Sequence, residues 1–229
     1  MPVLPGSPPL DITLRRSARS QQFSLRVSRL DGRVTLSVPL RAREAEAMAF
    51  ARSQEGWLRE TLAALPAAAG VGIGTILPVE GRMLRLQTGA GRGPRIEDDS
   101  LILPGDPKRA GAKAGAFLKL LARDRLMSAS DHHAGLVGCR VARITLRDTR
   151  SRWGSCSHDG GLMYSWRLIM APPSVLDYVA AHEVAHLVEM NHSAAFWAVV
   201  ARLYPGWKAE RAWLHAHGQG LHGYRFTGD

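Results

Sequence analysis

Apolar and polar residues alternate along the first stretch of the chain in the manner of β-strands. The apolar residues of segment 23–27 fall on one face, and those of segment 34–38 fall on one face of a second strand that ends at Pro39. Asp31-Gly32 between them is a typical two-residue hairpin turn. The pattern therefore predicts a β-hairpin in this part of the chain.

The spacing of the apolar residues then becomes helical. Residues 41–65 have this spacing, and Pro66 closes the segment. Two short strands are predicted near Met83–Gln87 and Ser100–Leu103, followed by a helix over Lys108–Met127.

The second half of the chain contains more helical patterns than strand patterns. The predicted elements are strands at Val141–Leu146 and Gly161–Met170 and helices from Pro172 to about Met190, over Ser193–Leu203 and over Trp207–His215. Together the elements predict an α+β fold. We expect a strand-rich N-terminal part with one long helix (1–105) and a part that carries the chemistry (106–229).

The composition is that of an ordinary globular protein. The chain has 229 residues, of which 45% are hydrophobic and 22% charged. No apolar run approaches the ~18 residues of a membrane span, so we expect no membrane partner. Two cysteines, Cys139 and Cys156, make a disulfide framework implausible, and the N-terminus lacks the pattern of a secretion signal. We therefore expect a reducing, cytoplasmic setting.

Positive charge is the one unusual bulk feature. Thirty Lys and Arg against twenty Asp and Glu give a net charge of +10, and residues 12–43 alone contain eight Arg and one Asp. Such a segment attracts nucleic acid, nucleotides or acidic proteins. An arginine-rich face that is merely solvated explains the same composition equally well.

The sequence His182-Glu183-Val184-Ala185-His186 is an H-E-x-x-H motif. Residues four apart on a helix point into one space, as two imidazole ligands of Zn²⁺ must. Glu183 is turned aside from the metal but can hydrogen-bond a water there, which is the position of a general base. Burying these groups without a metal would be costly, so the motif predicts a zinc site rather than ordinary core histidines.

A catalytic zinc site needs a third protein ligand. Glu189 lies on the same helical face as His182 but ~10 Å further along the axis, so three ligands on one straight helix would not converge. Asn191 tolerates the left-handed backbone that ends a helix, and a turn there would return His192 to the metal. We therefore favour His192 over Glu189.

A developing oxyanion would need a second donor besides the metal. Arg152 and Tyr178 are the candidates. A structural ion pair of Arg152 with Asp177 or Glu189, and a core position for Tyr178, are equally plausible.

Two further groups invite a functional interpretation. His132-His133 are interpreted as part of a surface turn, and Cys156 as a packed thiol rather than a metal ligand.

The motifs of the second half resemble the YgjP-like metallopeptidase-domain family, which is related to the SprT-like zinc proteases. The matching positions are Arg152–Ser157, Leu168, Pro172, Asp177–Val179, the H-E-x-x-H motif, Asn191–Ser193 and Phe196-Trp197, with Arg15–Ser17, Val34–Pro39 and Trp57 in the first half. The resemblance implies a zincin-like fold with zinc held at His182, His186 and His192 and with Glu183 as catalytic base. It does not define a substrate.

The sequence thus predicts a zinc-dependent hydrolase, a metallopeptidase that acts on protein or peptide substrates. Two alternatives stay open. One is hydrolysis of a nucleotide phosphoanhydride at the same metal, although the chain lacks a nucleotide-binding glycine loop. The other is a DNA-associated protease in which residues 12–43 dock on nucleic acid, which rests on analogy.

Overall fold

The computed structural model describes residues 2–28, 32–64 and 69–226. Contacts divide the chain into two compact units, residues 1–68 (unit 1) and 69–229 (unit 2). This boundary lies well before the division that was expected from the sequence between residues 105 and 106. The reason is that apolar residues on both sides of residue 106 belong to one hydrophobic core.

Unit 1 contains a four-stranded sheet in the order β1-β2-β4-β3. The strands are β1 (Val3–Leu4), β2 (Leu10–Ser17), β3 (Ser24–Val27) and β4 (Val34–Pro39). β3 and β4 are antiparallel, which confirms the predicted hairpin, and β2 runs parallel to β4 on its other side. Asp31 of the expected turn lies outside the described residues.

Two helices, α1 (Glu44–Ser53) and α2 (Glu55–Ala63), stand where a single helix was predicted over residues 41–65. The break falls at Gln54, whose ψ of 12° departs from helical backbone. Apolar residues of both helices pack with the alternating apolar residues of β4 in a separate core. Pro66 lies outside the described residues.

One arginine of the basic segment 12–43 has a role within unit 1. The Nη1 of Arg16 donates to the carbonyl oxygens of Leu40 and Ala42, at 3.1 and 2.7 Å. This guanidinium therefore ties β2 to the chain that follows β4. Binding of a polyanion by the segment stays a prediction.

Unit 2 begins with a second four-stranded sheet in the order β6-β7-β9-β8. The strands are β6 (Ile76–Val79), β7 (Arg82–Gly89), β8 (Arg95–Glu97) and β9 (Ser100–Pro104). β7 and β9 confirm the two predicted strands. β6 and β8 were not predicted, since three or four residues carry too little periodicity to detect.

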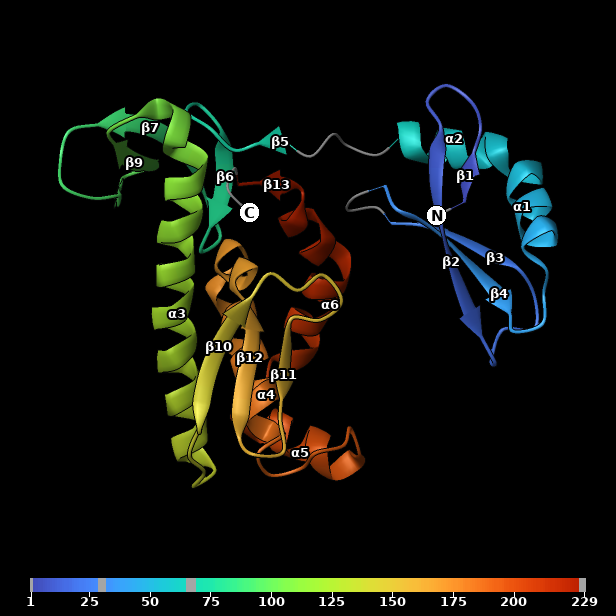
Figure 1. Ribbon diagram of the computed structural model, residues 1–229. Coiled ribbons are helices and arrows are strands. Elements are labelled where there is room, and N and C mark those ends of the chain that lie inside the picture. Colours follow the sequence, from blue (N-terminus) through green and yellow to red (C-terminus); the bar gives the residue numbers. More distant parts are fainter. Residues whose placement is uncertain (1, 29–31, 65–68, 227–229) are drawn as a thin grey trace. The chain divides into compact units, whose positions relative to one another are not determined.

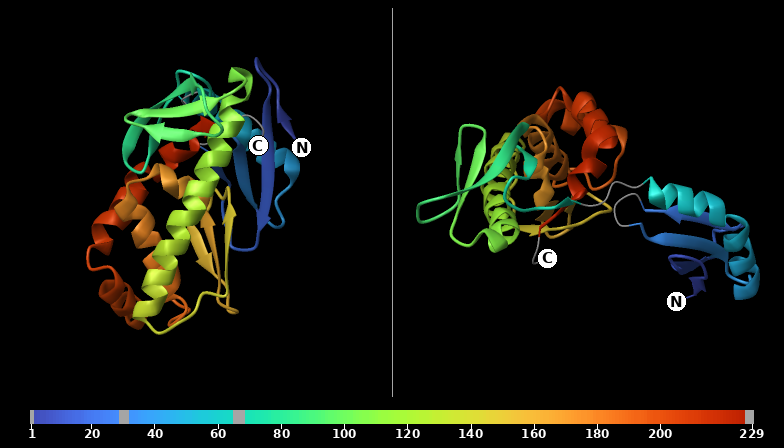
Figure 2. Two further views of the ribbon diagram at one scale, coloured as in Figure 1. Left: turned by 90° about the vertical axis from the view of Figure 1, so that its left-hand side faces the viewer. Right: turned by 90° about the horizontal axis from the view of Figure 1, so that it is seen from above.

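The helix α3 (Ala110–Leu136) follows a short 3₁₀ turn (Pro107–Arg109) and runs along unit 2 beside β10, as Figures 1 and 2 show. Its buried positions recur every fourth residue from Ala110 to Leu126. The helix was predicted to end at Met127, and the expected surface turn at His132-His133 is wrong because the helix continues through both residues. Among the described residues, no helix has both the length and the apolar character needed to cross a bilayer.

A three-stranded sheet in the order β10-β12-β11 lies next to α3. Its strands are β10 (Arg143–Arg147), β11 (Gly154–Cys156) and β12 (Gly161–Ser165). β10 is parallel to the central strand β12, and β11 is antiparallel to it. The strand predicted over 161–170 is half wrong, because residues 166–170 form a buried 3₁₀ helix.

The remaining helices are α4 (Pro173–Ala185), α5 (Ala194–Leu203) and α6 (Trp207–His217). A 3₁₀ turn (Gly218–His222) then leads to β13 (Tyr224–Arg225). β13 pairs in parallel with β5 (Ala69–Gly70), and the amide of Val71 donates to the carbonyl of Arg225 at 2.8 Å. The first and last strands of unit 2 are therefore joined.

A buried arginine fastens this C-terminal end to the interior of unit 2. Arg167, 6% exposed, forms a two-pronged ion pair with Asp148 at 2.6 and 2.9 Å. Its Nη1 also donates to the carbonyls of Leu221 and Tyr224, both at 3.0 Å. Burial opposes ionisation of Asp148, but the guanidinium outweighs it and lowers the pKa of this carboxyl.

Candidate metal centre and active site

The H-E-x-x-H motif lies at the C-terminal end of α4. This helix starts with Pro173 in its first turn, where the missing amide hydrogen costs nothing, and is buried on nearly all sides. His182 and Glu183 are therefore polar groups placed in an apolar setting. Such groups need partners, yet among the described residues the Nδ1 of His182 has no hydrogen-bond partner.

The helix α4 is shorter than the sequence indicated, and the connection that follows it is longer. The helix was predicted to reach about Met190, but it ends at Ala185, with His186 as the capping residue. Asn191 does not have left-handed backbone; its Oδ1 instead accepts from the amide of Ser193 at 3.1 Å. The Oγ of Ser193 in turn accepts from the amide of Phe196 and starts α5. Side-chain hydrogen bonds thus replace the expected left-handed turn.

This turn brings three imidazoles together. The available ring nitrogens of His182, His186 and His192 lie within 4.8 Å of one another, and the Nε2 atoms of His182 and His192 are 3.2 Å apart. Two nitrogens on a tetrahedral zinc with bonds of about 2.05 Å would be about 3.3 Å apart. The observed separation therefore suits two ligands of one zinc ion.

A hydrogen bond of His186 and the burial of His182 also suit a metal. The Nδ1 of His186 lies 3.0 Å from the carbonyl oxygen of Glu189, which leaves its Nε2 available. Burial, together with the neighbouring imidazoles, lowers the pKa of His182 to about 3. It is therefore neutral at pH 7, as a metal ligand must be. Glu189 contributes its main-chain carbonyl, and its carboxylate is outside the histidine cluster.

Glu183 is buried against the edge strand β11. Its side chain is 5% exposed, and burial raises its pKa to about 8, opposed by the positive charge of Arg152. A Cβ atom at Gly154 would lie 2.5 Å from its Oε1 and 2.6 Å from its Cγ. Only glycine therefore leaves room for this carboxylate.

A pocket of about 330 Å³ opens beside Glu183 and His182. Tyr178 and Gly154 line it, and α6 contributes Arg211 and His215. Sequence reasoning did not identify the two residues of α6. Their spacing places them on one helical face, but no sequence signal shows that this face meets the pocket.

The two candidate oxyanion donors occupy different places. Tyr178 lines the pocket beside His182, with ring centroids 6.0 Å apart, and burial raises the pKa of its hydroxyl to about 12, so it stays protonated. Arg152 is exposed and lies outside the pocket lining, although its charge acts on Glu183. Asp177, one expected ion-pair partner of Arg152, lies instead 2.8 Å from His133.

Cys156 is a half-buried thiol that packs against the core. Burial, with the negative charge of Glu183, raises the pKa of this thiol to about 11. It is therefore protonated at neutral pH and ill suited to bind a metal or attack a substrate.

Comparison with known proteins relates this geometry to a family. The chain matches no curated protein with significance. Among solved structures it is similar to the crystal structure of the metallopeptidase zymogen of Pyrococcus abyssi abylysin, with 19% identity, a TM-score of 0.36, and coverage of 41% of this chain and 93% of that one.

The family model described as YgjP-like, metallopeptidase domain, matches residues 21–217. This match covers most of the chain and agrees with the expected α+β, zincin-like fold. The chain belongs to the YgjP-like metallopeptidase-domain family.

Proposed function

We propose that this protein is a zinc-dependent metallopeptidase that hydrolyses peptide bonds in protein or peptide substrates. His182, His186 and His192 are the proposed zinc ligands, and Glu183 is the proposed general base. The observation that carries the proposal is the convergence of three imidazoles beside a buried carboxylate and an open pocket.

The donor set favours zinc over other cations. Neutral imidazole nitrogens suit zinc, whereas magnesium and calcium prefer oxygen ligands. Bound Zn²⁺ would polarise the scissile carbonyl and make the attacking water more acidic. A dication close to Glu183 also favours its ionised form, which offsets the effect of burial on its pKa.

The residues of the pocket then have separate tasks. Glu183 accepts a proton from the attacking water and passes it to the leaving amine. Tyr178, which lines the pocket and keeps its hydroxyl protonated, is the proposed donor to the developing oxyanion. Arg152 acts at longer range, since its charge lowers the pKa of Glu183 and so favours the ionised base.

A peptide substrate has a natural binding position along β11. This strand pairs with β12 on one side, and the described residues place no strand on its other side. An extended peptide would pair with that free edge through main-chain hydrogen bonds. The edge borders Glu183 through Gly154, so the substrate backbone would lie next to the base.

The test combines metal analysis with a protease assay. Purified protein should contain about one zinc per chain, and Glu183→Gln should keep that zinc but lose hydrolysis of labelled casein. Glu60→Gln, which makes the same change on the exposed face of α2, is the control and should retain both. Zinc-loaded protein without proteolysis would refute the proposal.

The same panel addresses the two alternative functions. Release of phosphate or pyrophosphate from nucleoside triphosphates, lost in Glu183→Gln, would indicate phosphoanhydride hydrolysis instead. Casein hydrolysis that rises on addition of DNA would indicate a protease that works on nucleic acid.

A further inference from the structure

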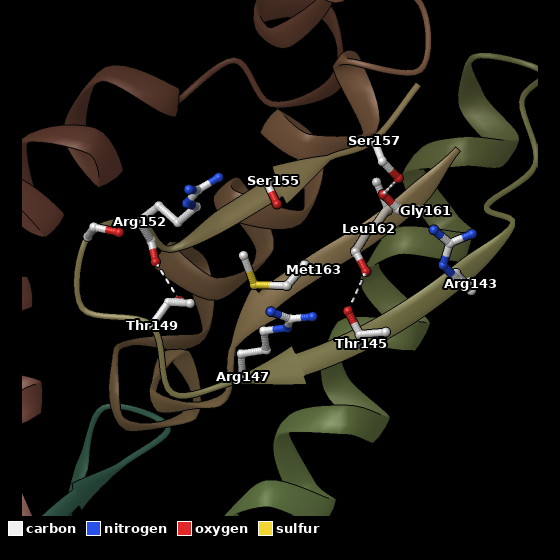
Figure 3. Close-up of a pocket in the computed structure, with 11 residues that line it drawn as sticks. Arg143, Thr145, Arg147, Thr149, Arg152, Ser155, Ser157, Gly161, Leu162 and Met163 are labelled. Carbon is white, nitrogen blue, oxygen red and sulfur yellow. Dashed lines mark hydrogen bonds between the residues drawn. The ribbon is translucent and has the colours of Figure 1, made fainter. Parts of the chain in front are cut away.

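The outer face of the sheet β10-β12-β11 carries a hollow of about 390 Å³, drawn in Figure 3. Its lining contains Arg143, Arg147 and Arg152, five serine and threonine side chains, and no acidic or aromatic residue. Besides the apolar residues Leu162 and Met163, this lining offers positive charge and hydroxyl groups to a ligand.

The alternation of strand residues explains why these groups share one face. In β10, Ile144 and Leu146 pack against the core, so Arg143, Thr145 and Arg147 point to the other side (Figure 3). Serine and threonine from β11 and from the loops on either side of it, together with Gly161, Leu162 and Met163 of β12, complete the lining. The face is therefore a built feature of the sheet.

Much of the charge in the hollow is uncompensated. Arg143 is paired with Asp159 at 2.7 Å. Within the described parts of the chain, the guanidinium groups of Arg147 and Arg152 have no ion-pair partner, and the hydroxyls of Ser151 and Ser155 have no hydrogen bond. These four side chains are free to bind an external anion.

We propose that this hollow binds the phosphate backbone of a nucleic-acid duplex. Arginine, serine and threonine are the side chains that contact phosphate oxygens. Arg143 and Arg147 are four residues apart on one strand, about 13 Å, so a ligand that reaches both must carry several anionic groups. The chain's net charge of +10 favours such a polyanion at longer range.

Two observations separate a duplex from other polyanions. The lining contains no aromatic ring, which a single strand would use to stack its bases. An extended acidic peptide gains affinity from main-chain hydrogen bonds to a strand edge. A ligand in this hollow lies instead on the face of the sheet, where it contacts side chains. A duplex backbone displays its charges outward and needs no main-chain pairing.

The hollow and the pocket beside Glu183 and His182 lie on opposite faces of β11. Gly154 faces Glu183, whereas its neighbour Ser155 lines the hollow. A duplex bound to the outer face would therefore leave the pocket beside Glu183 open. Arg152 connects the two places, since it lines the hollow and its charge acts on Glu183.

The test measures binding of a labelled DNA duplex of about 20 base pairs by fluorescence anisotropy across a range of salt concentrations. Arg147→Gln removes one phosphate contact, so the slope of log K against log salt should fall by about 0.9, with an affinity loss of about eightfold at 0.1 M salt. Thr145→Glu, which places a carboxylate in the hollow, should cause a larger loss. Arg123→Gln removes the same charge from the exposed side of α3 and should change affinity less than about twofold.

Each other outcome overturns the proposal. Equal losses in Arg147→Gln and Arg123→Gln would indicate attraction by net charge alone, and binding unchanged by Arg147→Gln would place the duplex elsewhere, for example on residues 12–43. Competition by polyglutamate or single-stranded DNA as strong as by unlabelled duplex would indicate a different ligand. Zinc content, which Arg147→Gln should leave unchanged, keeps this test separate from that of the proposed hydrolase.

Discussion

The contact between Gly154 and Glu183 allows a sharp test of the proposed base. In Gly154→Ala, the new methyl group would lie 2.6 Å from the Cγ of Glu183, about 1 Å inside ordinary carbon–carbon contact. Because β11 is hydrogen-bonded to β12, the carboxylate rather than the strand must give way. A displacement of about 1 Å from the productive geometry costs about 100-fold in rate, equivalent to about 2.7 kcal/mol.

The assay is casein hydrolysis by Gly154→Ala, with zinc measured in the same preparation. The expected result is a fall of about 100-fold in kcat/KM at full zinc content, since the three atoms nearest to the added methyl group all belong to Glu183 and none to a histidine. Gly135→Ala is the matched control, because nothing lies within 4 Å of a Cβ there, and it should keep full activity. Full activity in Gly154→Ala would refute the role of Glu183 as a closely positioned base.

Three further predictions follow from the same geometry. His192→Ala should remove stoichiometric zinc, measured by elemental analysis, whereas the exposed His158→Ala should not; full zinc in His192→Ala would exclude this residue as a ligand. In metal-free protein, burial raises the pKa of Glu183 to about 8, so the folded state favours the neutral acid. The stability that the neutral carboxyl contributes is therefore fully present below about pH 4.5 and is lost as the pH rises through 8. The free energy of unfolding, measured by urea titration, should therefore fall less between pH 5 and 8.5 in Glu183→Gln than in wild type, by up to a few kcal/mol. The same fall in both proteins would contradict this prediction. Asp148→Asn should lower the unfolding free energy by about 1–3 kcal/mol in the same assay, because Arg167 loses an ionised partner, and an unchanged midpoint would show that the pair is dispensable.

The parts of the site that lie close in sequence were predictable. The spacing of His182 and His186 fixes their common direction on a helix, and this requires no tertiary information. The position of His192 near the other two histidines was also predicted, but the local backbone structure that was expected to bring it there is wrong. A left-handed Asn191 was expected, whereas the helix ends early and the side chains of Asn191 and Ser193 form the turn.

The parts that depend on packing were not predictable. β11 has only three residues, within a loop rich in serine, glycine and arginine, and it becomes a strand because β12 offers hydrogen bonds. Arg211 and His215 reach the pocket because α6 packs against α4, which no local pattern shows. The same holds for the outer face of β10. The sequence shows that Arg143 and Arg147 share a face, but not that this face is uncovered.

The pairing of β5 with β13 has a consequence for the architecture of unit 2. Since Gly70 and Arg225 are neighbours across a strand pair, the polypeptide of this unit forms an almost closed loop. A short covalent bridge between these positions, with new termini opened in the exposed loop near Gly93, should give a circular permutant that retains the histidine cluster.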